Sequence, residues 1–194
     1  MKDYSVLERN LGYSFQDKKL LAHALTHSSY ASEHDLAYSE NNERLEFIGD
    51  AYLDAIIGNK LYEVMPNQPE GVLSKTRANI VCERSLATIA RNIGLGDFLF
   101  LGNGEEMYGG REKDSILADA VEAIIGAIIR ESGYDCADRV VLKLFEENIL
   151  LALQGKLYHD YKTALQEKLQ ERYKNVRIQY EPVSESGPDH RKIF

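Results

Sequence analysis

The segment from Ser115 to Ile129 restricts the fold more than any other part of the sequence. Its fifteen residues are apolar or small except for two acids, Asp119 and Glu122. A helix that is apolar nearly all round lies in a protein interior. The two acids are three residues apart and share one side of that helix. Each buried carboxylate costs roughly several kcal/mol unless it is paired, protonated or bound to a cation. The segment therefore predicts a buried helix with a polar site.

What neutralises these two acids is left open by the segment itself. They could pair with two arginines, or they could bind a cation together with other acids. Gly126 lies on the same helix face, where the missing side chain would let a second helix come close. A second helix elsewhere in the sequence is therefore expected to face Asp119 and Glu122.

A second acidic face occurs earlier, in the expected helix from about Asn42 to Val64. Four acids at spacings of 3, 4 and 4 fall within a sector of roughly 80° on a helix: Glu43, Glu46, Asp50 and Asp54. Such a stripe can simply be the solvated face of a surface helix. The segment around it is rich in apolar residues, however, so at least part of this helix is expected in the interior.

If the two acidic faces meet, Glu46 and Asp50 join Asp119 and Glu122 around one site. Four carboxylates without a cation would repel each other strongly. Oxygen donors without His or Cys suit a hard cation, Mg²⁺ with Mn²⁺ as a substitute. Carboxylates that hold such ions serve phosphodiester hydrolysis, because the ions activate water and stabilise the leaving oxygen. No G-x-S-x-G or reactive Cys/His arrangement supports acyl transfer instead.

The remaining segments predict a mainly α fold, with an all-helical first part and an α+β tail. The tail combines a helix over 160–174, an alternating strand from Val176 and turn residues before a second strand. These features predict an all-helical domain over 1–153, a linker over 154–159 and an incomplete domain over 160–194. Other expected helices run from about Leu20 to His27, from Pro69 to about Gly94 and from Cys136 to Leu153, and 32–41 and 102–110 are expected loops.

Composition adds limits on location and partners. The 194 residues contain no apolar run of the roughly 20 residues that a membrane span needs, and the N-terminus shows no signal-peptide core. We therefore expect a cytoplasmic protein with no membrane partner and no organic cofactor. The two cysteines, Cys82 and Cys136, suggest neither a disulfide nor a zinc site and are expected as small buried residues.

The charge distribution is uneven along the chain. The net charge of −8 argues at first against a nucleic-acid partner. Residues 1–150, however, carry 15 Lys and Arg against 25 Asp and Glu, a net charge of −10, whereas residues 151–194 carry 8 against 6, a net charge of +2. An acidic catalytic body with a mildly basic tail remains compatible with nucleic acid.

Several motifs in order resemble those of bacterial ribonuclease III. Asn42-Glu-Arg-Leu-Glu-Phe-Ile-Gly-Asp50 resembles its signature nonapeptide, and Leu117-Ala-Asp-Ala-Val-Glu-Ala123 resembles its second acidic motif. Supporting matches are Ala24-Leu-Thr-His-Ser-Ser-Tyr30, Pro69-Glu-Gly71 and the segment from Leu101 to Glu106. The resemblance covers essentially the whole chain.

This resemblance implies a homodimeric Mg²⁺-dependent endonuclease for double-stranded RNA that processes ribosomal and other structured precursors. It implies Glu46, Asp119 and Glu122 as metal ligands, and Asp50 and Glu122 as essential for hydrolysis. Glu43 and Glu70 match acidic positions that organise the cleft or the subunit interface, whereas Asp54 lies outside the motif and is expected in solvent.

Three further resemblances have simpler alternatives. Phe47 matches an aromatic residue that plugs a socket in the partner subunit, but it could be an ordinary core residue. His27 is expected as a satisfied residue at a helix end. The tail resembles the start of a double-stranded RNA-binding domain, in which the candidate contacts are Thr163, Gln166, Glu167 and His190. A generic amphipathic helix and turn is the alternative for the tail.

Two other functions compete with cleavage of duplex RNA. One is a protein that binds double-stranded RNA without cutting it, although the four carboxylate positions are all acidic here. The other is a metal-dependent hydrolase of small nucleotides, which fits the carboxylates but leaves the tail unexplained.

Overall fold

The computed structural model describes residues 3–157 together with Leu165, Leu169, Arg172 and Tyr173. The chain divides into two compact units, residues 1–157 and 158–194. The first unit is built from helices in the order α1 (Ser5–Leu11), α2 (Lys18–Ala24), α3 (Ser28–Glu33), α4 (Glu43–Val64), α5 (Glu70–Ile80), α6 (Glu83–Asn92), α7 (Asn103–Met107), α8 (Asp114–Ser132), α9 (Tyr134–Leu144) and α10 (Glu146–Leu153). Short 3₁₀ turns occupy Tyr38–Glu40, Leu95–Phe98 and Gly110–Glu112.

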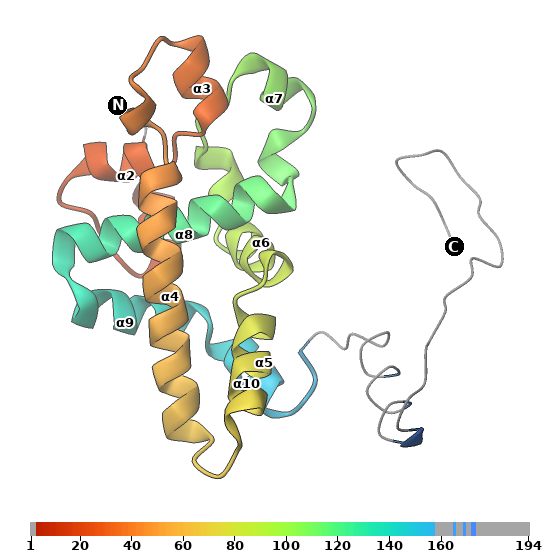
Figure 1. Ribbon diagram of the computed structural model, residues 1–194. Coiled ribbons are helices and arrows are strands. Elements are labelled where there is room, and N and C mark those ends of the chain that lie inside the picture. Colours follow the sequence, from red (N-terminus) through yellow and green to blue (C-terminus); the bar gives the residue numbers. More distant parts are fainter. Residues whose placement is uncertain (1–2, 158–164, 166–168, 170–171, 174–194) are drawn as a thin grey trace. The chain divides into compact units, whose positions relative to one another are not determined.

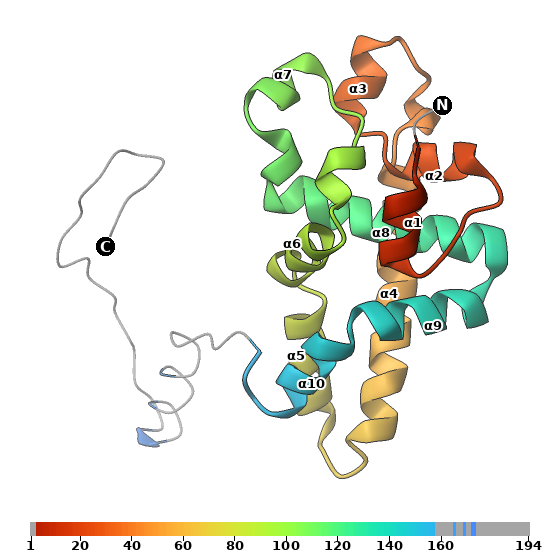
Figure 2. The same ribbon diagram turned by 180° about the vertical axis from the view of Figure 1, so that it is seen from behind.

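Helix α8 forms the centre of the first unit. It runs across α4 and lies beside α6 in Figure 1, and its contact with α4 is the most extensive between any two elements. Seen from behind in Figure 2, α1 and α9 cover the other side. Most residues of α8 are buried, including the run from Ala123 to Ile128. The expectation of a buried helix here is confirmed.

The crossing of α4 and α8 depends on glycine. A β-carbon placed on Gly126 of α8 would lie 2.1 Å from the carbonyl oxygen of Leu45 on α4. No side chain fits at that distance, so the two backbones pack directly against each other. The expectation that Gly126 permits a close approach is confirmed.

The bounds of α2 and α4 can be explained by residues at their ends. Asp17 caps α2, because its carboxylate accepts the backbone N–H groups of Lys19 and Leu20. Asn42 is the N-cap residue of α4, which ends at Val64 shortly before Pro66. The long second helix is therefore confirmed.

The single helix expected from Pro69 to Gly94 is wrong, because the chain breaks into α5 and α6. Cys82 between them has extended backbone angles, with φ −67° and ψ 154°. In a continuous helix, the six steps from Ile80 to Leu86 would leave these two side chains pointing about 120° apart. The break allows both side chains to be buried.

The expected helix from Cys136 to Leu153 is also two helices, α9 and α10, which separate at the buried Phe145.

The expected loop over 102–110 contains α7. A distant residue starts that helix, since the carboxylate of Glu33 accepts the backbone N–H of Asn103 at 2.9 Å. The loop expected over 32–41 begins inside α3, whose last residue is Glu33.

The remaining expectations on the fold have mixed outcomes. Both cysteines are free, but they are partly exposed, so the expectation of buried residues is wrong. Cys82 occupies the exposed junction of α5 and α6, where its Sγ atom donates to the carbonyl oxygen of Asn79. In the part of the chain that the structure describes, no helix is long and apolar enough to cross a membrane. The strands expected after Val176 lie outside the described residues.

Candidate metal centre

Asp119 and Glu122 are the polar interruptions on the inner face of α8. The neighbouring residues Ala118, Ala120, Val121 and Ala123 are all buried, whereas the two acids are half-buried. Their separation of three residues places both carboxylates on one side of the helix. They therefore open toward one strip of the surface beside α4.

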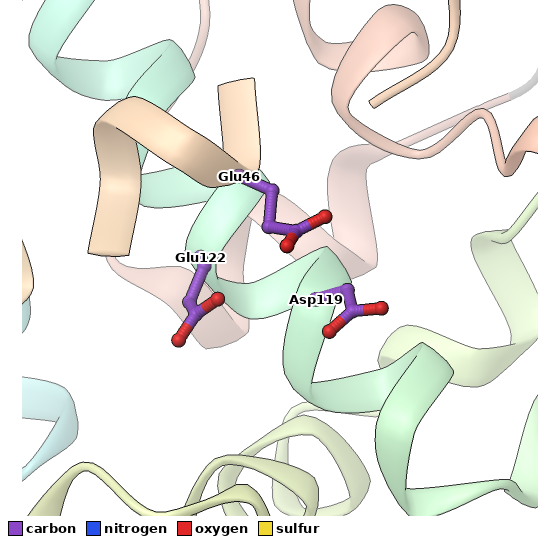
Figure 3. Close-up of side chains that lie close together, drawn as sticks. All are labelled: Glu46, Asp119 and Glu122. Atoms are coloured by element: carbon purple, nitrogen blue, oxygen red, sulfur yellow. The ribbon is translucent and has the colours of Figure 1, made fainter. Parts of the chain in front are cut away.

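Glu46 reaches the same strip from α4. One carboxylate oxygen from each of Glu46, Asp119 and Glu122 lies within 4.8 Å of the other two. Figure 3 shows the three side chains close together, with Glu46 coming from a different helix than the other two. The crossing of two helices thus brings together carboxylates that are more than 70 residues apart in the sequence.

Glu122 is the most strongly perturbed of these acids. The pKa of its carboxyl group is raised to about 8, first by burial and then by the charges of Asp50, Glu46, Asp119 and Asp54. All five of these causes raise that pKa. The pairing with arginines that the sequence left open does not occur here, because the ion pairs of the described chain involve neither Asp119 nor Glu122.

The pKa values of Glu46 and Asp119 are also raised. Burial is the largest cause for Glu46, followed by the charges of Asp119, Glu43 and Asp50. Burial is again the largest cause for Asp119, although the charge of His27 acts in the opposite direction. The cluster concentrates negative charge in a partly desolvated place, which is the electrostatic environment that favours a bound cation.

The other two acids of the stripe differ in their surroundings. Asp50 is exposed, one helical turn beyond Glu46, and lies outside the three-residue cluster. Its charge still raises the pKa values of Glu46 and Glu122. Asp54 forms an ion pair with Arg77 of α5 at 3.6 Å. Its side chain is still 40% exposed, so Asp54 lies in solvent as expected and also has Arg77 in reach of its carboxylate.

The two accessory acids lie at the starts of helices. Glu43 is in the first turn of α4 and raises the pKa values of both Glu46 and Asp119. Glu70 is exposed in the first turn of α5 and accepts a hydrogen bond from the hydroxyl of Ser74 at 2.6 Å. Among the described residues, Glu70 is not part of the carboxylate cluster.

Phe47 follows Glu46 directly but points away from the core. Its side chain is 77% exposed, so the alternative of an ordinary core residue is wrong. It borders a groove of about 700 Å³. The groove is lined by Leu20, His23, Tyr38, Ser39, Glu43, Arg44, Leu45, Phe47, Ile48 and Arg130.

His27 lies at the start of α3. It is the N-cap residue of α3, where its side chain accepts the backbone N–H of Ser29, so it is satisfied at a helix end as expected. The effect of its charge on Asp119 could not be predicted from the sequence, because it depends on tertiary packing between distant segments. The RNA contacts expected at Thr163, Gln166, Glu167 and His190 lie outside the described residues.

The donor atoms of the cluster fit a hard divalent cation. All three groups supply carboxylate oxygens, and neither His nor Cys takes part. Mg²⁺ and Mn²⁺ are bound by such oxygens, often from only a few carboxylates with waters completing the shell. Glu46, Asp119 and Glu122 can therefore hold a cation of this class.

Comparisons with known proteins agree with the motifs. A family model described as Ribonuclease-III-like matches residues 17–164. Ribonuclease 3 from Caldanaerobacter subterraneus subsp. tengcongensis is 51% identical over 188 residues, which cover 97% of this chain and 82% of that protein. Ribonuclease 3 from Campylobacter jejuni strain RM1221 is 49% identical and covers all of this chain and 84% of that protein.

Solved structures show the same fold. The nuclease domain of ribonuclease III from Campylobacter jejuni, studied for flexibility in a region involved in dimer formation, has a TM-score of 0.70 and 49% identity. The match covers 75% of this chain and 98% of that one. Dicer from Pichia stipitis, at 21% identity and a TM-score of 0.55 over 84% of this chain and 70% of that one, shares the fold alone. This chain belongs to the ribonuclease-III-like family.

Proposed function

We propose that this chain is an endoribonuclease that hydrolyses phosphodiesters of double-stranded RNA to 5′-phosphate and 3′-hydroxyl ends. The observation that carries the proposal is the convergence of three half-buried carboxylates from α4 and α8, whose pKa values are all raised. The family of its relatives supplies the substrate class. Processing of ribosomal, messenger and transfer RNA precursors in the cytoplasm is the corresponding biological role.

In this proposal Glu46, Asp119 and Glu122 hold Mg²⁺, for which Mn²⁺ can substitute. When bound, two such cations would supply an activated water and stabilise the leaving 3′-oxygen, as in a two-metal carboxylate mechanism. Glu122, whose carboxyl binds a proton most readily, must release it for the cation to bind. Asp50 is exposed and its charge acts on Glu46 and Glu122, so in this proposal its carboxylate orients the attacking water.

We also propose that the chain acts as a homodimer. The support is the exposed Phe47 beside the groove of about 700 Å³. In a two-fold interface the same patch serves both subunits, so each Phe47 can enter the groove of its partner. Glu43 lines that groove and also acts on Glu46, which would connect the subunit interface with the metal centre.

The tail from 160 to 194 is proposed as the first part of a double-stranded RNA-binding domain. Thr163, Gln166 and Glu167 on its helix and His190 in its loop are the candidate contacts to two successive minor grooves. Substitution of Gln166 or His190 should weaken duplex binding without changing affinity for Mn²⁺.

One experiment separates cleavage from binding without cleavage and from hydrolysis of small nucleotides. The full chain is incubated with long duplex RNA, single-stranded RNA and nucleoside triphosphates, each with Mg²⁺ or with Ca²⁺. We expect cutting of the duplex in Mg²⁺ only. Glu122→Gln removes a metal ligand but little of the surface that meets the RNA backbone, so it should abolish cleavage and retain duplex binding.

A matched control uses the same substitution at an exposed site. Glu63, near the end of α4, is exposed and bonds only to the side chain of Asn59 among the described residues. Glu63→Gln should leave cleavage unchanged. Absence of duplex cleavage by the wild-type chain in Mg²⁺, or equal cleavage by Glu122→Gln, contradicts the proposal.

A further inference from the structure

The groove beside Phe47 carries two arginines that have no partner in their own chain. Arg44 and Arg130 both line the groove, and both residues are exposed. Neither guanidinium group forms an ion pair or a hydrogen bond with any residue that the structure describes. Their charges are therefore available to a molecule that enters the groove.

One acid lines the same groove. In the part of the chain that the structure describes, Glu43 is the only acidic residue of the groove lining, and it forms no ion pair. It precedes Phe47 by four residues, so the two side chains project from the same side of α4, about 6 Å apart along the helix. A molecule that receives Phe47 therefore also receives the carboxylate of Glu43.

Hydrogen bonds within the chain fix the walls of the groove. The Nε2 atom of His23, on α2, donates to the carbonyl oxygen of Asn41 at 2.8 Å. The N–H of Asn42 donates to the carbonyl oxygen of Thr26, two residues after α2, also at 2.8 Å. These bonds hold α2 against the start of α4. Binding in the groove therefore needs little ordering of the backbone.

The charges of this patch favour one arrangement of two copies. In a two-fold dimer the same surface serves both subunits, so the patch faces its own copy. If the arginines of one copy faced the arginines of the other, their like charges would repel strongly. When the partner's Phe47 enters the groove, it instead brings the partner's Glu43 toward Arg44 and Arg130. Opposite charges then meet wherever the aromatic side chain is inserted.

We propose that Arg44 and Arg130 bind the partner's Glu43 across a two-fold interface, so that these charges set the register of the dimer. This inference deepens the proposed homodimer and rests on it. Exposed charge pairs contribute to specificity and orientation more than to affinity, because solvent screens them. The apolar contact of Phe47 supplies most of the affinity, and the arginines select the surface that it enters.

Charge reversal on the two sides of the pair tests the inference. Glu43→Arg leaves the patch without its acid, whereas Arg44→Glu combined with Arg130→Glu leaves it without its arginines. Each variant should repel its own copy, and an equimolar mixture of the two should form a heterodimer. Arg139→Glu is the matched control, because Arg139 is exposed on α9 and does not line the groove.

The measurement is sedimentation velocity of the full chain over a range of concentrations, without RNA or cation. One variant of the mixture carries a fluorescent label, and circular dichroism records the fold of each chain. We expect self-association of each charge-reversed variant to weaken at least about 100-fold, and the heterodimer to form within about 10-fold of the wild-type dissociation constant. Arg139→Glu should match the wild-type chain.

Neutral variants provide a second test that does not depend on the folding of the reversed chains. Glu43→Gln and Arg130→Gln should each weaken the dimer about threefold, as expected for an exposed charge pair. Their combination should cause no further loss, because both remove the same interaction. Losses that add in the combined variant would contradict the pairing.

The inference is overturned if the wild-type chain is a monomer, if both reversed variants dimerise as tightly as the wild-type chain, or if the folded variants form no heterodimer. Weaker binding of duplex RNA by the arginine variant with an unchanged dimer would make the arginines RNA contacts, which also overturns it. A heterodimer that forms as expected, from a wild-type chain that cuts no duplex RNA, would contradict the proposed nuclease activity and support the interface.

Discussion

Gly49 of α4 lies directly against the backbone of Glu122 on α8, so that a β-carbon at Gly49 would be 1.8 Å from the Glu122 carbonyl oxygen. Glu122, which supplies one carboxylate to the candidate metal centre, is therefore in main-chain contact with α4, the helix that supplies Glu46. Any side chain at position 49 must push the two helices apart.

Gly49→Ala is expected to destabilise the fold by about 1–3 kcal/mol, because overpacking at a rigid backbone contact forces displacement of the helices. The free energy of unfolding is measured in urea. Gly71→Ala in α5 is the matched control, since no atom lies within 4 Å of its added β-carbon. That change should stabilise the chain by up to about 1 kcal/mol, through better helix propensity. Equal stability of the two variants would contradict the packing argument.

The stability of the chain without added cation should fall as pH rises. The pKa of Glu122 is raised from 4.5 to about 8 in the folded chain. Between these values the folded chain keeps a proton that the unfolded chain has lost, so the stabilisation is complete below the lower value and disappears through the higher one. In EDTA, the melting temperature of the wild-type chain should therefore decline more between about pH 5 and about pH 8 than that of Glu122→Gln.

The affinity for a cation should rise with pH, whereas the stability falls, because both depend on the same proton of Glu122. Because Mg²⁺ requires the ionised carboxylate, its affinity should increase with pH until Glu122 has lost its proton near pH 8. Calorimetry in buffers of different ionisation enthalpy measures the proton release. Binding without proton release at about pH 6 would show that Glu122 is already ionised there.

Phe47→Asp is expected to convert a dimer into a monomer. The substitution places a charge on the 77% exposed aromatic residue beside the groove. Tyr62→Asp is a suitable control, because Tyr62 is 73% exposed on the same helix but does not line that groove. Sedimentation velocity distinguishes the two species. A dimer that survives Phe47→Asp would place the interface elsewhere.

Asp50 and Asp54 should respond differently to removal of their charge. Asp50→Asn is expected to lower cleavage by orders of magnitude, as an acid required for hydrolysis. Asp54 pairs with Arg77 at the surface, where such a pair contributes at most about 1 kcal/mol. Asp54→Asn should keep cleavage within a few-fold of the wild-type rate, measured under single-turnover conditions. Equal losses in both variants would extend the catalytic stripe to Asp54.

The two helices of the metal centre could be predicted from the sequence because their signals are local. The apolar segment around Asp119 and Glu122 can be buried only as a helix, and Asn42 and Pro66 bracket α4. Burial also made the two acids conspicuous as lone charges. Glu46, in contrast, could be separated from its neighbours in the stripe only through a motif.

The features that were not predicted depend on contacts between distant residues. Helix α7 starts where Glu33, 70 residues earlier, accepts the N–H of Asn103. The break at Phe145 places that side chain in the core. No turn-forming residue next to it in the sequence predicts the break. The charge of His27 acts on Asp119 although the two residues are 92 positions apart in the sequence. None of these relations leaves a periodic pattern in the chain.

The direct backbone contact between α4 and α8 has a consequence for ion choice. The carboxylates project from α4 and α8, whose spacing is fixed at Gly49 and Gly126 by main-chain atoms. Such atoms cannot move aside as flexible side chains do. Ca²⁺ needs oxygen distances of about 2.3–2.6 Å, compared with about 2.0–2.1 Å for Mg²⁺. If the centre binds Mg²⁺ as proposed, a chain whose two helices were held further apart is expected to bind Mg²⁺ less tightly relative to Ca²⁺.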